Sequence, residues 1–167
     1  MIKRKVAVVM GSDSDLGVMK NCIQMLKRFE LPFEVRVISA HRTPAAAAQF
    51  AKTAEKNGFA VIIAAAGKAA HLAGVLAAST PLPVIGVPIK SSTMDGLDSL
   101  LSTVQMPSGI PVATVAIDGA ANAALLAVQI ISLSDKVLRR KFKEYKQALA
   151  EEVAAKDTKI QEEVEKL

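Results

Sequence analysis

Short apolar runs alternate along the chain with longer segments in which apolar residues recur every three or four positions. The runs carry almost no polar alternation, which is typical of strands buried on both faces of a parallel sheet. They comprise residues 5–10, 34–39, 60–65, 83–89 and 112–117. Strands that alternate with helices predict an α/β fold with right-handed crossovers. We expect a flavodoxin-like, doubly wound sheet of five parallel strands in the order 2-1-3-4-5.

Helical periodicity fills the segments between the predicted strands. In residues 14–29 the apolar positions follow spacings of three and four. In residues 44–57, Pro44 suits the first turn of a helix and Gly58 suits a cap at its end. From Asp135 onward one apolar stripe runs along a charged helix. Its members are Leu138, Phe142, Tyr145, Leu149 and Val153.

No low-complexity linker divides the chain. We therefore expect residues 1–134 to form one α/β domain, followed by an amphipathic helix in residues 135–167. This helix packs either on its own domain or on a neighbouring subunit. A subunit contact is favoured, because a long helix after the last strand easily outruns a small domain.

Composition narrows the class of partner. The chain has 167 residues, of which 51% are hydrophobic but only 4% aromatic, so aliphatic side chains fill the predicted core. The scarcity of aromatic rings disfavours stacking on single-stranded nucleic acid. The net charge is +5, yet the last 33 positions hold nine basic and eight acidic residues, and no Lys/Arg run resembles a nucleic-acid patch. A small anionic substrate fits better.

Cysteine usage and targeting signals point to an ordinary intracellular protein. Cys22 is the single cysteine, which excludes a disulfide within one chain, and no residue spacing resembles a metal site. The apolar run near the N-terminus is too short for a signal peptide. Gly67, Lys68 and His71 interrupt the longest weakly charged stretch, which argues against a membrane span. We expect a soluble, cytoplasmic protein without a metal.

Unusual polar loops follow each of the first three predicted strands, at the sheet edge where such folds bind ligands. The first is GSDSD, residues 11–15. Gly11 permits close approach of a ligand, and the hydroxyl and N–H groups of Ser12 and Ser14 favour a phosphate. Asp15 suits ribose hydroxyls instead. The same pattern is equally typical of a plain helix cap at Ser14 or Asp13.

The other two loops, SAHRTP (39–44) and AGKAAH (66–71), contain the only two histidines. A lone histidine is more often structural, but two at the same sheet edge favour function. His41 suits a general acid–base, since a histidine side chain can both give and accept a proton near neutral pH. Arg42 suits a bidentate phosphate contact or a plain surface position, and His71 suits a supporting role. The residues thus indicate cofactor-free proton transfer on a small phosphorylated molecule.

Six motifs in order extend this interpretation across residues 5–133. They are MGSDSD, SAHRTP, AGKAAHLAG, LPVIGVP, GLDSLLSTVQMPSGIPVATVAI and NAALLA. Together they resemble the 5-(carboxyamino)imidazole ribonucleotide mutase family (PurE) of purine biosynthesis, in its bacterial mutase branch. The resemblance implies an isomerase that moves a carboxylate from the exocyclic nitrogen to ring carbon C4 without metal, ATP or organic cofactor. Residues 1–134 would be its nucleotide-binding catalytic domain.

The resemblance also implies roles for individual residues. His41 would shuttle the proton while CO2 is released and recaptured in a closed pocket. Contacts to the substrate phosphate and ribose would come from Ser12, Asp15 and Arg42. The neighbouring positions expected to touch the substrate in the same two motifs are Ser14, Ser39 and Ala40. The pocket for the base and the carboxylate would be lined by Gly67, Lys68, Ala70, His71 and Leu72.

The family further implies a homo-octamer whose sites are built partly from neighbouring chains. Residues 99–111 lack a clear period and are expected to form a loop, either between subunits or over the core. The chain departs from the usual AGGAAHLPG pattern at Lys68 and Ala73, and it is shortened before the asparagine of NAALLA. Lys68 either holds the migrating carboxylate or points into solvent.

A basic residue at the Lys68 position is typical of a related branch that carboxylates aminoimidazole ribonucleotide directly with CO2. That branch lacks AAHL and HRTP, so the mutase is favoured and the direct carboxylase is the alternative. Two non-enzymatic classes share the fold. A flavodoxin-type FMN carrier is disfavoured by the scarcity of aromatic residues, and a receiver module by the lack of an aspartate after the third strand.

Overall fold

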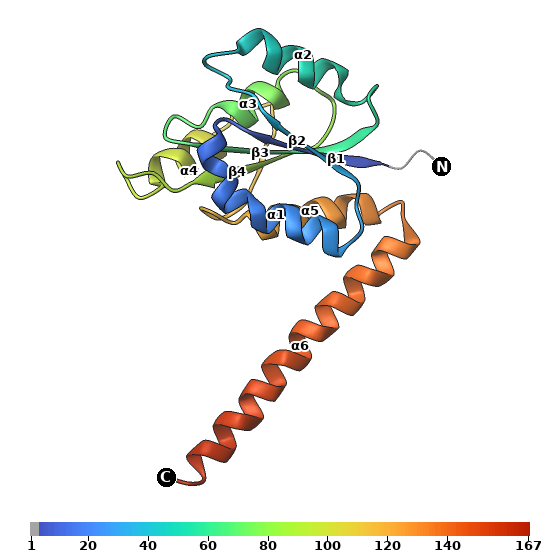
Figure 1. Cartoon of the computed structure of the whole chain (residues 1–167), viewed down its shortest axis with the longest axis vertical. Coiled ribbons are helices and arrows are strands. Elements are labelled where there is room, and N and C mark those ends of the chain that lie inside the picture. Colours follow the sequence, from blue (N-terminus) through green and yellow to red (C-terminus); the bar gives the residue numbers. More distant parts are fainter. Residues whose placement is uncertain (1–3) are drawn as a thin grey trace. The chain divides into compact units, whose positions relative to one another are not determined.

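The computed structural model describes residues 4–167. The chain divides into two units, one ending at Ile131 and the other running from Ser132 to Leu167. The first unit contains a five-stranded parallel sheet in the order β2-β1-β3-β4-β5, which confirms the predicted topology (Figure 1). Its strands are β1 (Lys5–Met10), β2 (Phe33–Val37), β3 (Phe59–Gly67), β4 (Val84–Ile89) and β5 (Ala113–Thr114).

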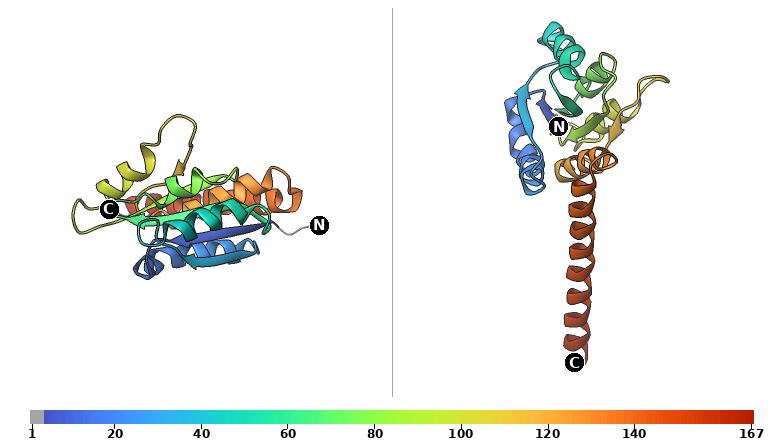
Figure 2. Two further views of the ribbon diagram at one scale, coloured as in Figure 1. Left: turned by 90° about the horizontal axis from the view of Figure 1, so that it is seen from above. Right: turned by 90° about the vertical axis from the view of Figure 1, so that its right-hand side faces the viewer.

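Helices cover both faces of this sheet. They are the 3₁₀ turn η1 (Asp13–Asp15), α1 (Leu16–Arg28), α2 (Pro44–Ala54), α3 (Leu72–Ala77), α4 (Leu97–Val104) and α5 (Ala120–Ser132). Figures 1 and 2 show α2 and α3 on one face and α1 and α5 on the other. Pro44 begins α2, and Gly58 has a positive φ of 82° beyond its end, as the sequence suggested.

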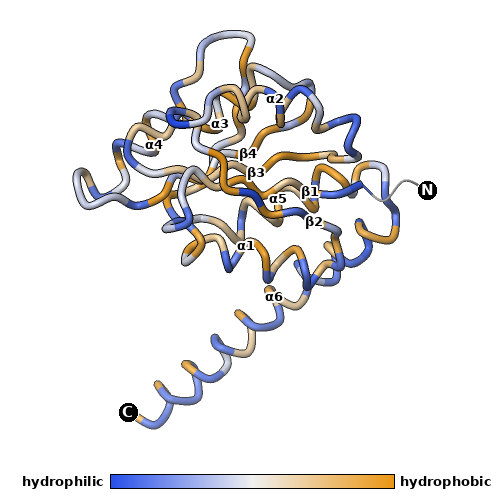
Figure 3. The backbone as a smooth tube through the Cα atoms, turned by 45° about the horizontal axis from the view of Figure 1, so that its top comes forward, coloured by the Kyte–Doolittle hydropathy of each residue, from blue (hydrophilic) through white to orange (hydrophobic). Residues whose placement is uncertain are grey.

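The core is aliphatic and centres on the inner strands. Residues Val6 to Val9 of β1 are fully buried, as are Val61 to Ile63 of β3. The tube coloured by hydropathy shows these strands as continuous apolar segments (Figure 3). Continuous apolar runs in the sequence therefore mark the centre of the sheet correctly.

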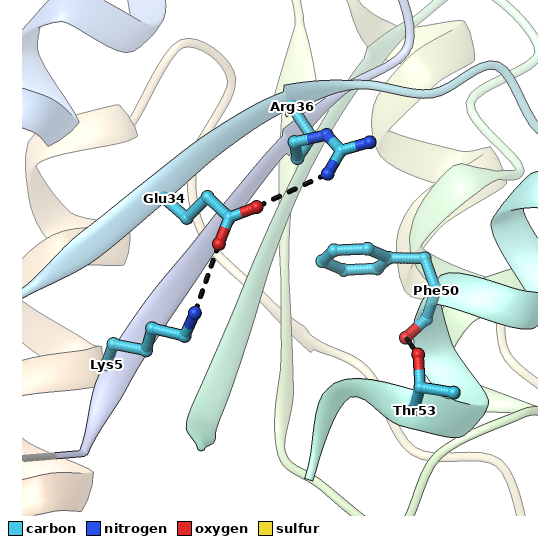
Figure 4. A network of polar contacts seen from close by, with 5 residues as sticks. All are labelled: Lys5, Glu34, Arg36, Phe50 and Thr53. Carbon is cyan, nitrogen blue, oxygen red and sulfur yellow. Dashed lines mark hydrogen bonds and ion pairs between the residues drawn. The ribbon is translucent and has the colours of Figure 1, made fainter. Parts of the chain in front are cut away.

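Strand β2 is different, because it lies at the edge of the sheet. Its side chains are partly or largely exposed, and Val37 is 54% exposed, so the expectation of burial on both faces is wrong for this strand. Figure 4 shows Glu34 of β2 between Lys5 (3.1 Å) and Arg36 (3.3 Å). Charged side chains on an edge strand discourage pairing with another sheet.

Strand β5 spans two residues rather than the six predicted in 112–117. The carbonyls of Gly86 and Pro88 accept hydrogen bonds from Val115 and Asp118, so both residues face the β5 side of β4. Pro88 has no N–H to donate on that side, and the ladder therefore ends early.

Helix α4 corrects the expectation of a loop in residues 99–111, since residues 99–104 of this helix lie in that segment. Its buried side chains are Ser99 and Thr103, whereas Leu97 and Leu101 are each 45% exposed. The Ser99 hydroxyl donates to the carbonyl of Ile89 at 2.8 Å. The apolar residues of α4 recur at helical spacing but lie largely on its exposed face. The segment 99–111 hides this spacing, because the helix ends at Val104 and a stretch with Pro107 and Gly109 follows.

The second unit is dominated by α6 (Lys136–Val164). The Asp135 carboxylate caps its start by accepting from the Leu138 N–H at 2.9 Å. No helix in residues 4–167 is both long and apolar enough to span a membrane.

Candidate active site

Loops that follow β1, β2, β3 and β4 surround one cavity of about 690 Å³ at the carboxyl edge of the sheet. It is lined by Gly11, Ser12, Ser14, Asp15, Ser39, Ala40, His41, Arg42, Ala66, Gly67, Lys68, Ala69, His71, Leu72, Ile89, Lys90, Ser91 and Ser92. All the candidate site residues are therefore brought together except Ala70, which is 1% exposed and does not line the cavity.

The loop after β1 is shaped by its own side chains. Ser12, rather than Ser14 or Asp13, is the N-cap: its hydroxyl accepts from the Ser14 N–H at 3.3 Å. The Asp15 carboxylate reciprocates by accepting from the Ser12 N–H at 3.1 Å, completing a capping box. The cap lies further upstream than expected because a 3₁₀ turn precedes α1.

Asp15 is buried at the floor of this loop. Burial raises the pKa of its carboxyl, and hydrogen bonds from Ser12 and Ser14 partly offset that rise. Both oxygens already accept hydrogen bonds within the loop. Asp15 therefore supports the shape of the loop in addition to lining the cavity.

Arg42 joins the second loop to the first. Its guanidinium donates to the carbonyl of Gly11 and to the hydroxyl of Ser39, each at 3.4 Å. Ser39 is itself held by Thr43, whose hydroxyl donates to the Ser39 carbonyl at 2.8 Å. A cation is thus fixed beside the N–H and hydroxyl groups of the GSDSD loop, which is an arrangement suited to a phosphate.

The two histidines form a pair across the second and third loops. His41 Nε2 and His71 Nδ1 are 2.9 Å apart, with the rings nearly perpendicular at 89°. A hydrogen bond at this distance requires one nitrogen to carry the proton and the other to accept it. In two neutral imidazole rings, the second nitrogen of the donor ring is then an acceptor, and the second nitrogen of the acceptor ring carries a proton. The pair can therefore exchange a proton with a ligand and pass it between rings.

Lys68 lines the same cavity as this pair and has a φ of 55°, a left-handed conformation that is unusual for a residue with a side chain. Strained backbone of this kind clusters at functional sites. Lys68 lines the cavity, as does Lys90 from the loop after β4. With Arg42, these residues place three cations around a space whose one lining carboxylate belongs to the buried Asp15.

Sequence reasoning missed the loop after β4. Lys90, Ser91 and Ser92 line the cavity, and Ser91 donates to Asp98 at 2.9 Å. The same rule that singled out the first three strands applies to β4, since it also ends at this edge. The residues of this segment, GVPIKSS (86–92), contain neither a histidine nor a glycine-rich turn, so their polarity is less conspicuous than that of the other three loops. Within residues 4–167 no cluster of three metal-ligating side chains occurs.

Comparison with known proteins assigns the chain that forms this cavity to a family. The profile of AIR carboxylase matches residues 5–152. The chain belongs to the AIR carboxylase family. The match confirms the resemblance drawn from the six motifs, and it includes all four loops of the cavity.

Individual relatives agree closely over most of their length. An N5-carboxyaminoimidazole ribonucleotide mutase of Pyrococcus abyssi is 61% identical over 143 residues, covering 86% of this chain and 82% of the relative. A mutase of the same name from Mycobacterium leprae is 55% identical over 157 residues, covering 94% and 92%. The crystal structure of Treponema denticola PurE has a TM-score of 0.86 at 32% identity, covering 93% of this chain and 98% of that one.

Proposed function

We propose that this chain is an N5-carboxyaminoimidazole ribonucleotide mutase. It isomerises the carboxyamino ribonucleotide to 4-carboxy-5-aminoimidazole ribonucleotide in de novo purine biosynthesis. The observation that carries the proposal is the match to mutases over nearly the whole chain, including every loop of the cavity. The geometry of the cavity supports a place for each part of this substrate.

The phosphate binds at the end of the cavity formed by Ser12, Ser14 and Arg42. Hydroxyl and N–H donors at the start of a helical segment meet a fixed guanidinium there. The ribose then lies over Asp15, and the base extends toward the histidine pair between Ser39–Ala40 and Gly67–Leu72.

Lys68 and Lys90 hold the carboxylate end of the substrate. A phosphate dianion and a carboxylate together carry about three negative charges at neutral pH, which matches Arg42, Lys68 and Lys90. The Asp95 carboxylate is 2.8 Å from Lys90 Nζ in the free protein and competes with the substrate for it. Lys68 is therefore the more available of the two lysines.

His41 moves the proton. When the bond between the exocyclic nitrogen and the carboxylate breaks, CO2 leaves and the nitrogen takes a proton from His41. Ring carbon C4 then attacks CO2, and its hydrogen passes to His41 as a proton, which restores the starting state. His71 holds His41 in place through the 2.9 Å contact and fixes which of its nitrogens faces the substrate.

A coupled assay with two substrates tests the function. Purified protein is offered the carboxyamino ribonucleotide, or aminoimidazole ribonucleotide with bicarbonate and CO2. A mutase converts the first rapidly and needs very high CO2 for the second. Efficient use of the second substrate at modest CO2, with the first ignored, establishes the alternative direct carboxylase, for which Lys68 in the cavity is the favouring observation.

His41→Asn tests the assignment of the proton shuttle. Turnover should fall by about 10²–10⁴, the usual contribution of a general acid–base, while nucleotide binding persists. Arg42→Ala should instead weaken binding with a smaller effect on kcat, because it removes the phosphate contact. Substantial activity in the His41 variant contradicts its role.

We also propose that the chain works as a cytoplasmic homo-octamer. Leu97, Leu101 and Val104 of α4 are each about half exposed and would be covered by neighbouring subunits. Sedimentation velocity of the full chain tests this assembly, and a monomer at micromolar concentration contradicts it.

A further inference from the structure

Helix α6 carries an apolar stripe that continues well past its first turns. Leu149, Val153, Ile160 and Val164 are 40–65% exposed. Their separations of four, seven and four residues place them on one face of the helix. Figure 3 shows the distal helix as hydrophilic with single apolar positions. The family match ends at residue 152, so most of this distal stripe lies beyond it.

Charge is distributed unevenly along the same helix. Residues 136–146 contain six Lys or Arg and one Glu, whereas residues 151–166 contain six Asp or Glu and three Lys. The proximal half is therefore strongly basic and the distal half is acidic. The ion pairs Arg140–Glu144 and Glu152–Lys156 within α6 join neighbouring turns and leave this polarity in place.

These two features together specify a partner. A second copy of α6 running antiparallel would cover the apolar stripe and set each basic half against an acidic half. A parallel copy would set like charges side by side, which is unfavourable in paired helices. Antiparallel pairing is also isologous, so a two-fold axis closes it without leaving a free surface.

We propose that α6 pairs antiparallel with α6 of a second copy of this chain, centred near Val153. In this arrangement Lys143 lies at the level of Glu163 of the second copy, and Lys141 lies at the level of its Glu165. Lys156, the polar residue within the stripe, weakens the pair and limits it to modest affinity. The pairing is independent of the proposed mutase activity, because it uses residues outside the cavity.

Distances between spin labels on the full chain test both the pairing and its direction. A cysteine replaces Ala154 in one variant and Gln161 in another. Cys22 does not take the label, because it is buried and burial raises the pKa of its thiol to about 12. Equivalent residues of an antiparallel pair separate by about 3 Å for each residue from the centre, given a rise of about 1.5 Å per residue.

The two labels at 161 should therefore lie roughly 15 Å farther apart than those at 154, given a distance of about 10 Å between the paired helix axes. Adding Ile160→Glu should abolish the short distance at 154. Thr158→Glu is the matched control, since it adds the same charge in place of a β-branched residue on the opposite face. Equal distances at both sites, no short distance at 154, or equal effects of both variants would each overturn the proposal.

Discussion

Four residues other than glycine in the described chain have positive φ: Glu30, Lys68, Asp95 and Asp118. Glu30 follows the end of α1, where its N–H donates to the carbonyl of Lys27 and closes the helix. Lys68 has the same φ of 55° but lies in the cavity. The same conformation thus serves a helix end in one place and the site in the other, and substitutions can separate these two roles.

Replacing Lys68 with glycine should stabilise the fold and weaken substrate binding. Glycine adopts a positive φ freely, so the gain should be about 0.5–1 kcal/mol after the entropy of the unfolded chain is included. Loss of the cation should raise KM about fivefold, the worth of a partly exposed ion pair. Urea unfolding and steady-state kinetics measure the two effects. Glu30→Gly is the control, for which we expect a similar gain in stability and no change in KM. An unchanged KM in Lys68→Gly would mean that the Lys68 side chain points into solvent.

The pH dependence of stability should reveal Asp15. Burial raises the pKa of its carboxyl above the value of about 4 in the unfolded chain. The protonated form therefore favours folding, and its contribution is complete below pH 4 and lost as the pH rises through the folded-state pKa. Asp15→Asn cannot ionise but can still accept from the Ser12 N–H. The free energy of unfolding of the wild type should thus fall relative to the variant between pH 3 and 7 in urea titrations; parallel curves contradict this.

Among the secondary-structure elements, accuracy of prediction follows the physical signal available in the sequence. β1 matches its predicted bounds because it is apolar and buried from Val6 to Met10 and lies between two strands. α4 was missed because the segment 99–111 begins inside the helix and runs well past its end at Val104. Its burial of Ser99 and Thr103 depends on the folded chain, since Ser99 donates to the carbonyl of Ile89 on β4. Three of the four site loops were found from their unusual polarity. The loop after β4 could have been included by the same rule of strand ends. The contact between His41 and His71 depends on tertiary placement, so it could not be read from residue types.

Packing of α4 on β4 depends on Gly86. A Cβ at this position would lie 2.3 Å from the Cγ2 atom of the buried Thr103. Gly86→Ala should therefore destabilise the protein by about 1–3 kcal/mol, the usual effect of overpacking. Thr103→Ser removes the clashing methyl and keeps the hydroxyl that donates to Ser99. The double variant should recover much of the loss in urea unfolding, and strictly additive losses would show that the clash is not the cause.

At the scale of the whole molecule, the residues that line the cavity and the long helix α6 lie in different parts of the sequence. Each described residue that lines the cavity lies between Gly11 and Ser92. Helix α6 begins 44 positions after Ser92 and contributes no residue to that lining. The residues that line the cavity and the residues of the proposed helix pairing therefore lie in separate parts of the sequence.

A chain ending at Glu152 tests this separation. It retains the whole family match and every residue of the cavity, but it lacks Val153 and the apolar positions beyond it. We expect kcat and KM for the carboxyamino ribonucleotide to stay within about twofold of the full chain, a change worth roughly 0.4 kcal/mol. The full-length Ile160→Glu variant is the control, because it disrupts the distal stripe without shortening the helix. A large fall in kcat for the shortened chain alone would mean that the distal helix reaches a neighbouring cavity. Equal activity of both variants would mean that the distal helix has no part in catalysis, in agreement with the proposed pairing.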